Sequence, residues 1–109
     1  MKRFRLANLT ETGGAHAFAD LTEGKRITHG GLHVYEGAET PHTDYHVHDC
    51  EEVFVILQGR ATLPMGPFDD PDEVHQLETG DVVIIEPGED HHLTGVAEDP
   101  PAVLWFEVR

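Results

Sequence analysis

Two histidines and a glutamate, His46, His48 and Glu52, are the side chains of this sequence best spaced for chemistry. In an extended strand, residues two apart point to the same face and lie about 7 Å apart along the chain. The two imidazoles can therefore reach one ion together. Glu52 opens the apolar run at 53–57 and returns to the same face if the three residues before it form a short bend. Two imidazoles and a carboxylate can hold Zn, Fe, Mn, Ni or Cu, depending on geometry.

A further imidazole can come from the downstream pair His91 and His92. This pair follows an apolar run and a Pro-Gly turn, in which Gly88 can supply a positive φ angle. The residues alone leave open which of the two histidines faces the first pair. Glu51 likewise competes with Glu52 for the carboxylate role. Strand alternation puts the two side chains on opposite faces, so only one of them can face the histidines.

These two stretches resemble the paired motifs of the cupin family, in its small single-domain form. The first motif is matched at the family's spacings by His46, His48, Glu52 and Gly59. The second motif is matched by Gly80, Gly88 and His91. The sequence departs from the family at turn and strand-end positions, where Thr40, Glu86 and Gly95 replace a glycine, a proline and an asparagine. These departures affect local backbone geometry and leave the four metal positions in place.

The resemblance implies an all-β fold of the cupin type, a double-stranded β-helix or jelly-roll barrel. It selects Glu52 over Glu51 and His91 over His92, and His92 then becomes a rim residue or a hydrogen-bond donor to a ligand. It implies one divalent transition metal (Fe, Mn, Ni, Zn or Cu) with four ligands: His46, His48, Glu52 and His91. It also allows Glu52 to be catalytic, as a proton acceptor that remains a ligand.

Two classes of function are compatible with such a site, because the fold hosts many activities. The first is a metalloenzyme, an oxidoreductase of the dioxygenase type or an isomerase, that acts on a small oxygenated organic molecule. The second is a non-catalytic small-molecule-binding or sensor module. An octahedral ion with four protein ligands keeps two positions open, which favours the enzyme. The lack of an obvious general acid or base beyond the ligand set favours the binding module.

The rest of the chain predicts one domain over residues 1–109, because short apolar runs alternate with turn signals. We expect an N-terminal strand and arm over 1–26, with the strand at 4–9, and the barrel over 27–109. Apart from the His-x-His segment, the barrel strands are expected at 27–36, 53–57, 60–65, 74–77, 82–85 and 102–108.

Strand alternation around Glu52 predicts which side chains face the interior. If Glu52 points inward, Phe54 and Ile56 do so as well. An outward apolar row remains, formed by Val53, Val55 and Leu57. Such a row needs cover from another sheet, from the N-terminal arm or from a second subunit. We therefore expect a homodimer.

The remaining histidines are weaker candidates. His33 shares a strand face with Tyr35 and could line the cavity. Four others lack partners at ligand spacing and are expected at the surface, namely His16, His29, His42 and His75. On the last strand, Trp105 points to the opposite face from its two neighbours, and aromatic residues at such spacings belong to a core more often than to a substrate site.

Charge and composition restrict the partners and the compartment. The net charge is −14, although residues 1–26 hold five of the seven basic residues. Such a surface repels phosphate backbones, which argues against nucleic acid and leaves a small molecule as the expected partner. No apolar run approaches roughly 18 residues, which argues against a membrane span. The single cysteine, Cys50, and the lack of an apolar signal core predict a cytoplasmic protein.

Overall fold

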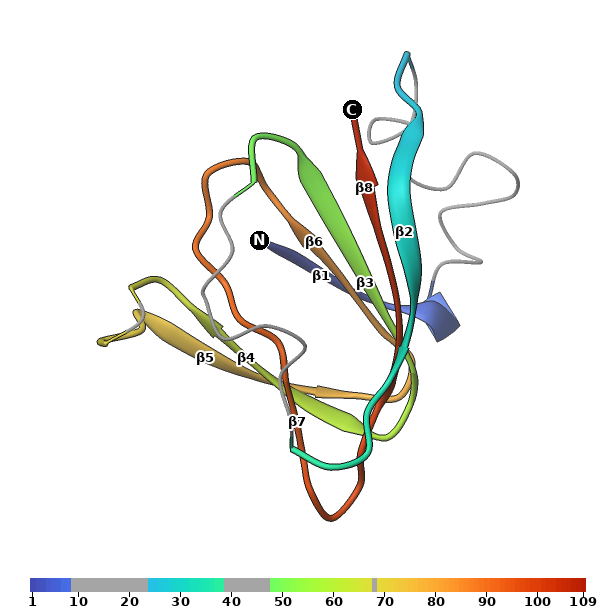
Figure 1. Ribbon diagram of the computed structural model, residues 1–109, viewed down its shortest axis with the longest axis vertical. Coiled ribbons are helices and arrows are strands. Elements are labelled where there is room, and N and C mark those ends of the chain that lie inside the picture. Colours follow the sequence, from blue (N-terminus) through green and yellow to red (C-terminus); the bar gives the residue numbers. More distant parts are fainter. Residues whose placement is uncertain (9–23, 39–47, 68) are drawn as a thin grey trace.

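The computed structural model describes residues 1–8, 24–38, 48–67 and 69–109. Nearly all regular structure in these ranges is β-strand, so the all-β prediction is confirmed (Figure 1). The strands are β1 (Lys2–Arg5), β2 (Ile27–Val34), β3 (Glu51–Gln58), β4 (Arg60–Met65), β5 (Glu73–Glu78), β6 (Asp81–Ile85), β7 (Thr94–Gly95) and β8 (Ala102–Val108). No helix among these residues is long and apolar enough to cross a membrane.

The first strand lies earlier than the sequence predicts. β1 ends at Arg5, and Leu6–Asn8 forms a 3-10 turn instead of continuing the strand. The reason is the length of its partner: β6 begins at Asp81, which is opposite Arg5, so the ladder has no further residues to pair with. The Leu6 amide instead donates to the carbonyl of Gly80 at 2.8 Å, and the chain turns away.

The described strands form two antiparallel sheets, which face each other in Figure 1 as in a jelly roll. The larger sheet has the order β1-β6-β3-β8-β2 and the smaller one the order β5-β4-β7. β3 lies at the centre of the larger sheet, between β6 and β8. This central strand carries Glu52, and its two neighbours therefore decide which side chains surround that carboxylate.

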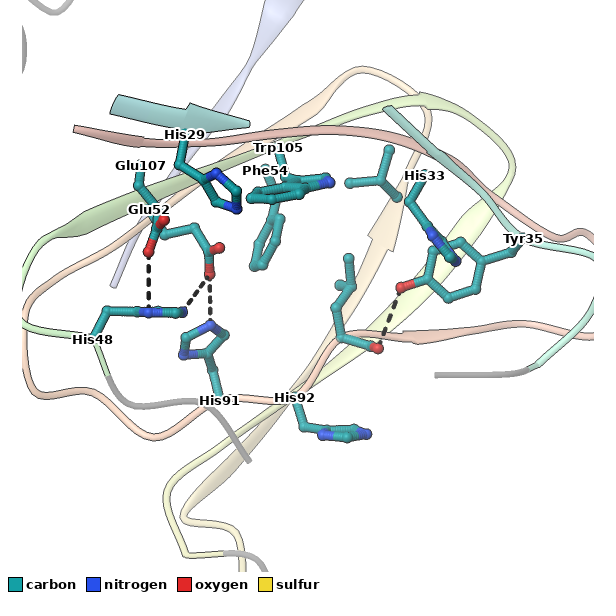
Figure 2. A pocket seen from close by; sticks show the side chains of 12 residues that line it. His29, His33, Tyr35, His48, Glu52, Phe54, His91, His92, Trp105 and Glu107 are labelled. Carbon is teal, nitrogen blue, oxygen red and sulfur yellow. Dashed lines mark hydrogen bonds and ion pairs between the residues drawn. The ribbon is translucent and has the colours of Figure 1, made fainter. Parts of the chain in front are cut away.

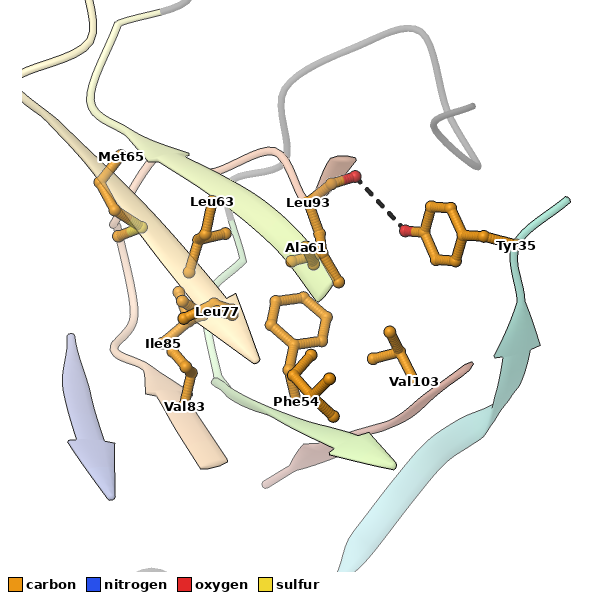
Figure 3. Packing of buried hydrophobic residues seen from close by; sticks show 11 residues of the cluster. Tyr35, Phe54, Ala61, Leu63, Met65, Leu77, Val83, Ile85, Leu93 and Val103 are labelled. Carbon is orange, nitrogen blue, oxygen red and sulfur yellow. Dashed lines mark hydrogen bonds between the residues drawn. The ribbon is translucent and has the colours of Figure 1, made fainter. Parts of the chain in front are cut away.

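The hydrophobic core fills the space between the two sheets (Figure 3). Phe54 and Ile56 point into it, as predicted from Glu52, and Ile56 is completely buried. The core comprises Tyr35, Phe54, Ile56, Ala61, Leu63, Met65, Leu77, Val83, Ile85, Leu93 and Val103. Burying these side chains against one another stabilises the contact between the sheets.

A second apolar cluster covers part of the opposite face of the larger sheet. It contains Val53, Val82, Ile84 and Val108, with Phe4, Val55 and Phe106 packed against it. The predicted outward row is therefore unevenly exposed: Val53 is 2% exposed and Leu57 is 43% exposed. Beyond this cluster, Leu32 and Leu104 pair across β2 and β8 and are both exposed. The homodimer stays a prediction.

Asp81, at the start of β6, anchors β1 to the larger sheet. Its fully buried carboxylate accepts hydrogen bonds from Arg3 at 2.8 Å, from Arg5 at 2.9 Å and from the Glu78 amide at 2.8 Å. Burial alone would raise the pKa of Asp81, but these three donors together outweigh it, so the pKa lies below its ordinary value. Asp81 is therefore an ionised, structural carboxylate.

Candidate metal centre

A turn in the second motif is tied directly to a histidine of the first. His48 lies just before β3, and its carbonyl accepts a hydrogen bond from the Gly88 amide at 2.9 Å. Gly88 has a φ of 83°, the left-handed conformation that its predicted turn role requires. After this turn, His91 forms an isolated bridge with Met65 at the end of β4. These contacts bring His48 and His91 to the same corner of the molecule.

Three of the four predicted ligands converge there: His48, Glu52 and His91 (Figure 2). Glu52 Oε1 is 2.7 Å from His91 Nε2 and 3.4 Å from His48 Nε2. One donor atom from each of the three residues lies within 4.8 Å of the other two. Because metal–ligand bonds of these types are about 2.0–2.2 Å long, small rotations suffice for all three to reach one ion. The fourth predicted ligand, His46, lies outside the described residues.

The outer nitrogen of each imidazole also faces an acceptor. His48 Nδ1 is 3.1 Å from Glu107 Oε1, and His91 Nδ1 is 3.1 Å from the carbonyl oxygen of Glu89. Acceptors thus lie on both sides of each ring, and a proton on each Nδ1 would leave the lone pair of Nε2 directed toward Glu52. A neutral imidazole cannot donate on both sides. A cation held between the two Nε2 atoms and Glu52 satisfies every group at once, so the donor set fits a metal ion.

The three donors line one end of a pocket of about 340 Å³ (Figure 2). Its volume is in the range of small-molecule sites. The prediction that His33 and Tyr35 line the cavity is confirmed, since both border this pocket. His92 borders it as well, in line with its expected place at the rim. The end with His48, Glu52 and His91 is called the metal end below. The rings of Phe54 and Trp105 separate it from the opposite end, where His33 and Tyr35 lie (Figure 2).

Three pocket residues were missed or undervalued by the sequence reasoning. His29 is exposed, as predicted, and it also borders the pocket, which the sequence did not suggest. Trp105 and Glu107 share a strand face and both line the pocket. Alternation along 102–108 could have linked Glu107 to Trp105, although nothing in the sequence points from either residue to His48.

Cys50 lies next to the site without the properties of a ligand. Burial, strengthened by the nearby charge of Glu107, raises the pKa of the Cys50 thiol. Among the described residues, Cys50 is not one of the donors that converge with Glu52. Its sulfur lies 3.7 Å from Glu107 Oε1, a weak contact that adds to the packing around that carboxylate.

The sequence model described as Cupin domain matches residues 31–107, which is most of the chain. The protein belongs to the cupin family. Over 57 residues this cupin is 35% identical to auxin-binding protein 5 of Zea mays, and the match covers 49% of the chain and 38% of the maize protein. The chain thus spans less than two thirds of that relative.

Two solved structures share the fold of this cupin. A cupin protein from Bacteroides fragilis superposes with a TM-score of 0.60 at 21% identity, over 75% of this chain and 67% of the other. HEPD from Streptomyces albus, solved with 2-hydroxyethylphosphonate and Fe(II) bound, superposes with a TM-score of 0.53 at 17% identity, over 70% of this chain and 16% of the other. At such identities the likeness concerns the fold alone.

Proposed function

We propose that this cupin binds one divalent transition metal through His46, His48, Glu52 and His91, and catalyses oxidoreductase or isomerase-type chemistry on a small oxygenated organic molecule. One observation carries the proposal: Glu52 Oε1 faces two Nε2 atoms whose rings are already held by acceptors at Nδ1. His46 enters through its motif position. The Fe(II) in HEPD, a protein of the same fold, supports the class of metal.

The chain's own residues would prepare this site for chemistry. A bound metal would supply Lewis-acid stabilisation of a substrate oxygen, or a place for dioxygen. Glu107 and the Glu89 carbonyl fix the two imidazole rings, which lowers the cost of ordering the ligands when they bind. Phe54, only 7% exposed, excludes water from one side and strengthens the local electrostatic interactions. Glu52, the one carboxylate of the ligand set, is placed to accept a proton from a bound hydroxyl group.

Acid–base groups beside the ligands favour the enzyme over the binding module. The sequence offered no general acid or base outside the ligand set, whereas the pocket is also bordered by His29 and His92. An imidazole can donate or accept a proton near neutral pH. These side chains give the proposed reaction a route for protons that does not require loss of a ligand.

The test is a panel of diketones, catechols, flavonols, thiols and sugars with protein loaded with Fe(II), Mn(II) or Ni(II), following oxygen uptake and product formation. We expect turnover of at least one class with one metal, and its loss in His48→Ala. The matched control is His75→Ala, which removes an imidazole that pairs with Glu73 on β5 and lies outside the pocket lining. Tight binding without turnover under any metal would instead establish the sensor function.

A further inference from the structure

The two ends of the pocket offer a ligand different chemistry (Figure 2). The metal end carries two carboxylates, Glu52 and Glu107. The indole of Trp105, with His29 against it, lies between the two ends, and the opposite end carries the imidazole of His33 against the ring of Tyr35 (Figure 2). A ligand that reaches the metal end must therefore also lie against aromatic surface.

Trp105 is held in place as a wall of this pocket. It pairs in register with Gly31 on β2, between the two strand positions that carry His29 and His33. A Cβ atom at Gly31 would lie 3.4 to 3.6 Å from three atoms of the indole, so the ring packs directly on bare backbone. His29 contacts the indole edge-on, with 5.1 Å between ring centroids and 66° between planes. The fixed, half-buried indole is suited to contact a flat ligand ring.

The charges of the pocket disfavour an anionic ligand. Among the lining residues that the structure describes, none is a lysine or an arginine. A divalent metal would balance the two carboxylates, which leaves no fixed cation for a carboxylate or phosphate on the ligand. At the far end, His33 Nε2 is shielded from solvent and has no hydrogen-bond partner among the described residues. This nitrogen can hydrogen-bond a polar atom of a ligand, but imidazole is ordinarily neutral above about pH 6.5 and is not the fixed positive charge that a buried anion requires.

We infer that the pocket selects an uncharged, ring-bearing compound with adjacent oxygen atoms, the oxygens at the metal end and the ring against Trp105. Carboxylated and phosphorylated compounds are disfavoured. The inference rests on the proposed metal site. Its size requirement is met, since an apolar cavity of about 150 Å³ can hold benzene, and this pocket measures about 340 Å³.

The experiment is calorimetric titration of protein loaded with Zn(II), which is redox-inert. The three ligands are catechol, 3,4-dihydroxybenzoate and trans-cyclohexane-1,2-diol. Titrations are made at pH 8, where unpaired imidazoles are ordinarily neutral, and in 0.5 M NaCl to screen the surface charge. We expect catechol to bind roughly 10-fold or more tightly than the benzoate. In Trp105→Leu, the preference for catechol over the cyclohexanediol should fall roughly 3- to 10-fold, because only catechol has a ring face.

Two further variants separate a lost ring contact from a damaged fold. Trp105→Phe keeps an aromatic wall and should retain most of the preference for catechol. Phe106→Leu changes an aromatic residue of the same strand that packs on the outer face, and should leave the preference unchanged. Because Trp105 is the single tryptophan, quenching of its emission by catechol also reports binding in this pocket.

Three results would overturn the inference. The first is equal or tighter binding of 3,4-dihydroxybenzoate. The second is a catechol preference within twofold of wild type in folded Trp105→Leu. The third is the absence of catechol binding to protein shown by elemental analysis to hold zinc, an outcome that leaves the metal proposal standing. Failure to retain any metal would refute the proposed function itself, and the inference with it.

Discussion

Glu52 on β3 and Asp81 on β6 are buried carboxylates on neighbouring strands with different surroundings. Asp81 is fully buried and accepts hydrogen bonds from two arginines and a backbone amide. Glu52 is 7% exposed, and its carboxylate lies against the Nε2 atoms of His48 and His91. Burial alone does not distinguish them. The kind of partner does.

Arginine carries its charge at every physiological pH, whereas imidazole is ordinarily neutral above about pH 6.5. The charge of Asp81 is thus balanced permanently, and the residue serves to fix β1. The charge of Glu52 faces groups that can be neutral, which leaves it available for an exchangeable cation. A carboxylate that fixes the fold and one that is available to a cation thus differ in whether their neighbours carry a fixed charge.

The largest effect is expected from Glu52→Gln. An amide cannot supply the anionic donor that balances the cation, so metal affinity should fall by more than about 100-fold. The stability of the metal-free protein should change little, because the amide can still occupy the same site. Competition with a chromophoric chelator measures the affinity, and urea unfolding of the apo protein measures the stability. Unchanged affinity would place the metal elsewhere.

Asp81→Asn should produce the reverse result. Removing this carboxylate breaks the charged hydrogen bonds that join β1 to β6, and we expect a loss of about 2 kcal/mol in the free energy of unfolding. The figure is modest because the two guanidinium groups can turn to water. Metal content should equal that of the wild type. A variant that kept its stability but lost its metal would contradict the division between the two carboxylates.

A smaller loss of metal affinity is expected from Glu107→Gln. This side chain contacts His48 Nδ1 at 3.1 Å and orients a proposed ligand. Losing such an outer partner typically costs 10- to 100-fold in affinity, and we expect about 10-fold here, because the amide oxygen can still accept from Nδ1–H. The same chelator competition reports it. An effect as large as that of Glu52→Gln would indicate that Glu107 is itself a ligand.

The stability that Asp81 contributes should depend on pH in a defined direction. The pKa of Asp81 is lowered on folding, so the stability it contributes is present above its unfolded pKa of about 3.9. That contribution is lost as the pH falls through the folded value. The stability gap between the wild type and Asp81→Asn should therefore be constant above about pH 5 and shrink in stronger acid. Urea unfolding across this range tests the sign, and a gap that widened in acid would refute it.

The sequence was sufficient for what depends on local spacing. Alternation within one strand predicts that Glu52, Phe54 and Ile56 point inward, and the resemblance to the cupin motifs implies that His48 and His91 meet. Both expectations agree with the positions of the described residues. The strand predictions for 27–36 and 102–108 were also close to β2 and β8.

What could not be predicted depends on which distant strands pair, and in which register. Glu107 lies opposite Glu52 because β8 pairs with β3, and His29 lies opposite Glu107 because β2 pairs with β8. Neither pairing leaves a local signal, so the residue that orients His48 stayed hidden. The early end of β1 has the same cause, since the length of a strand is limited by its partner.

The most direct test of the metal centre is elemental analysis of protein purified without an affinity tag. The wild type and His75→Ala should carry close to one transition metal per chain. His48→Ala, His91→Ala and the His46→Ala, His48→Ala double variant should lose most of it. Full retention of metal in the double variant would contradict the account.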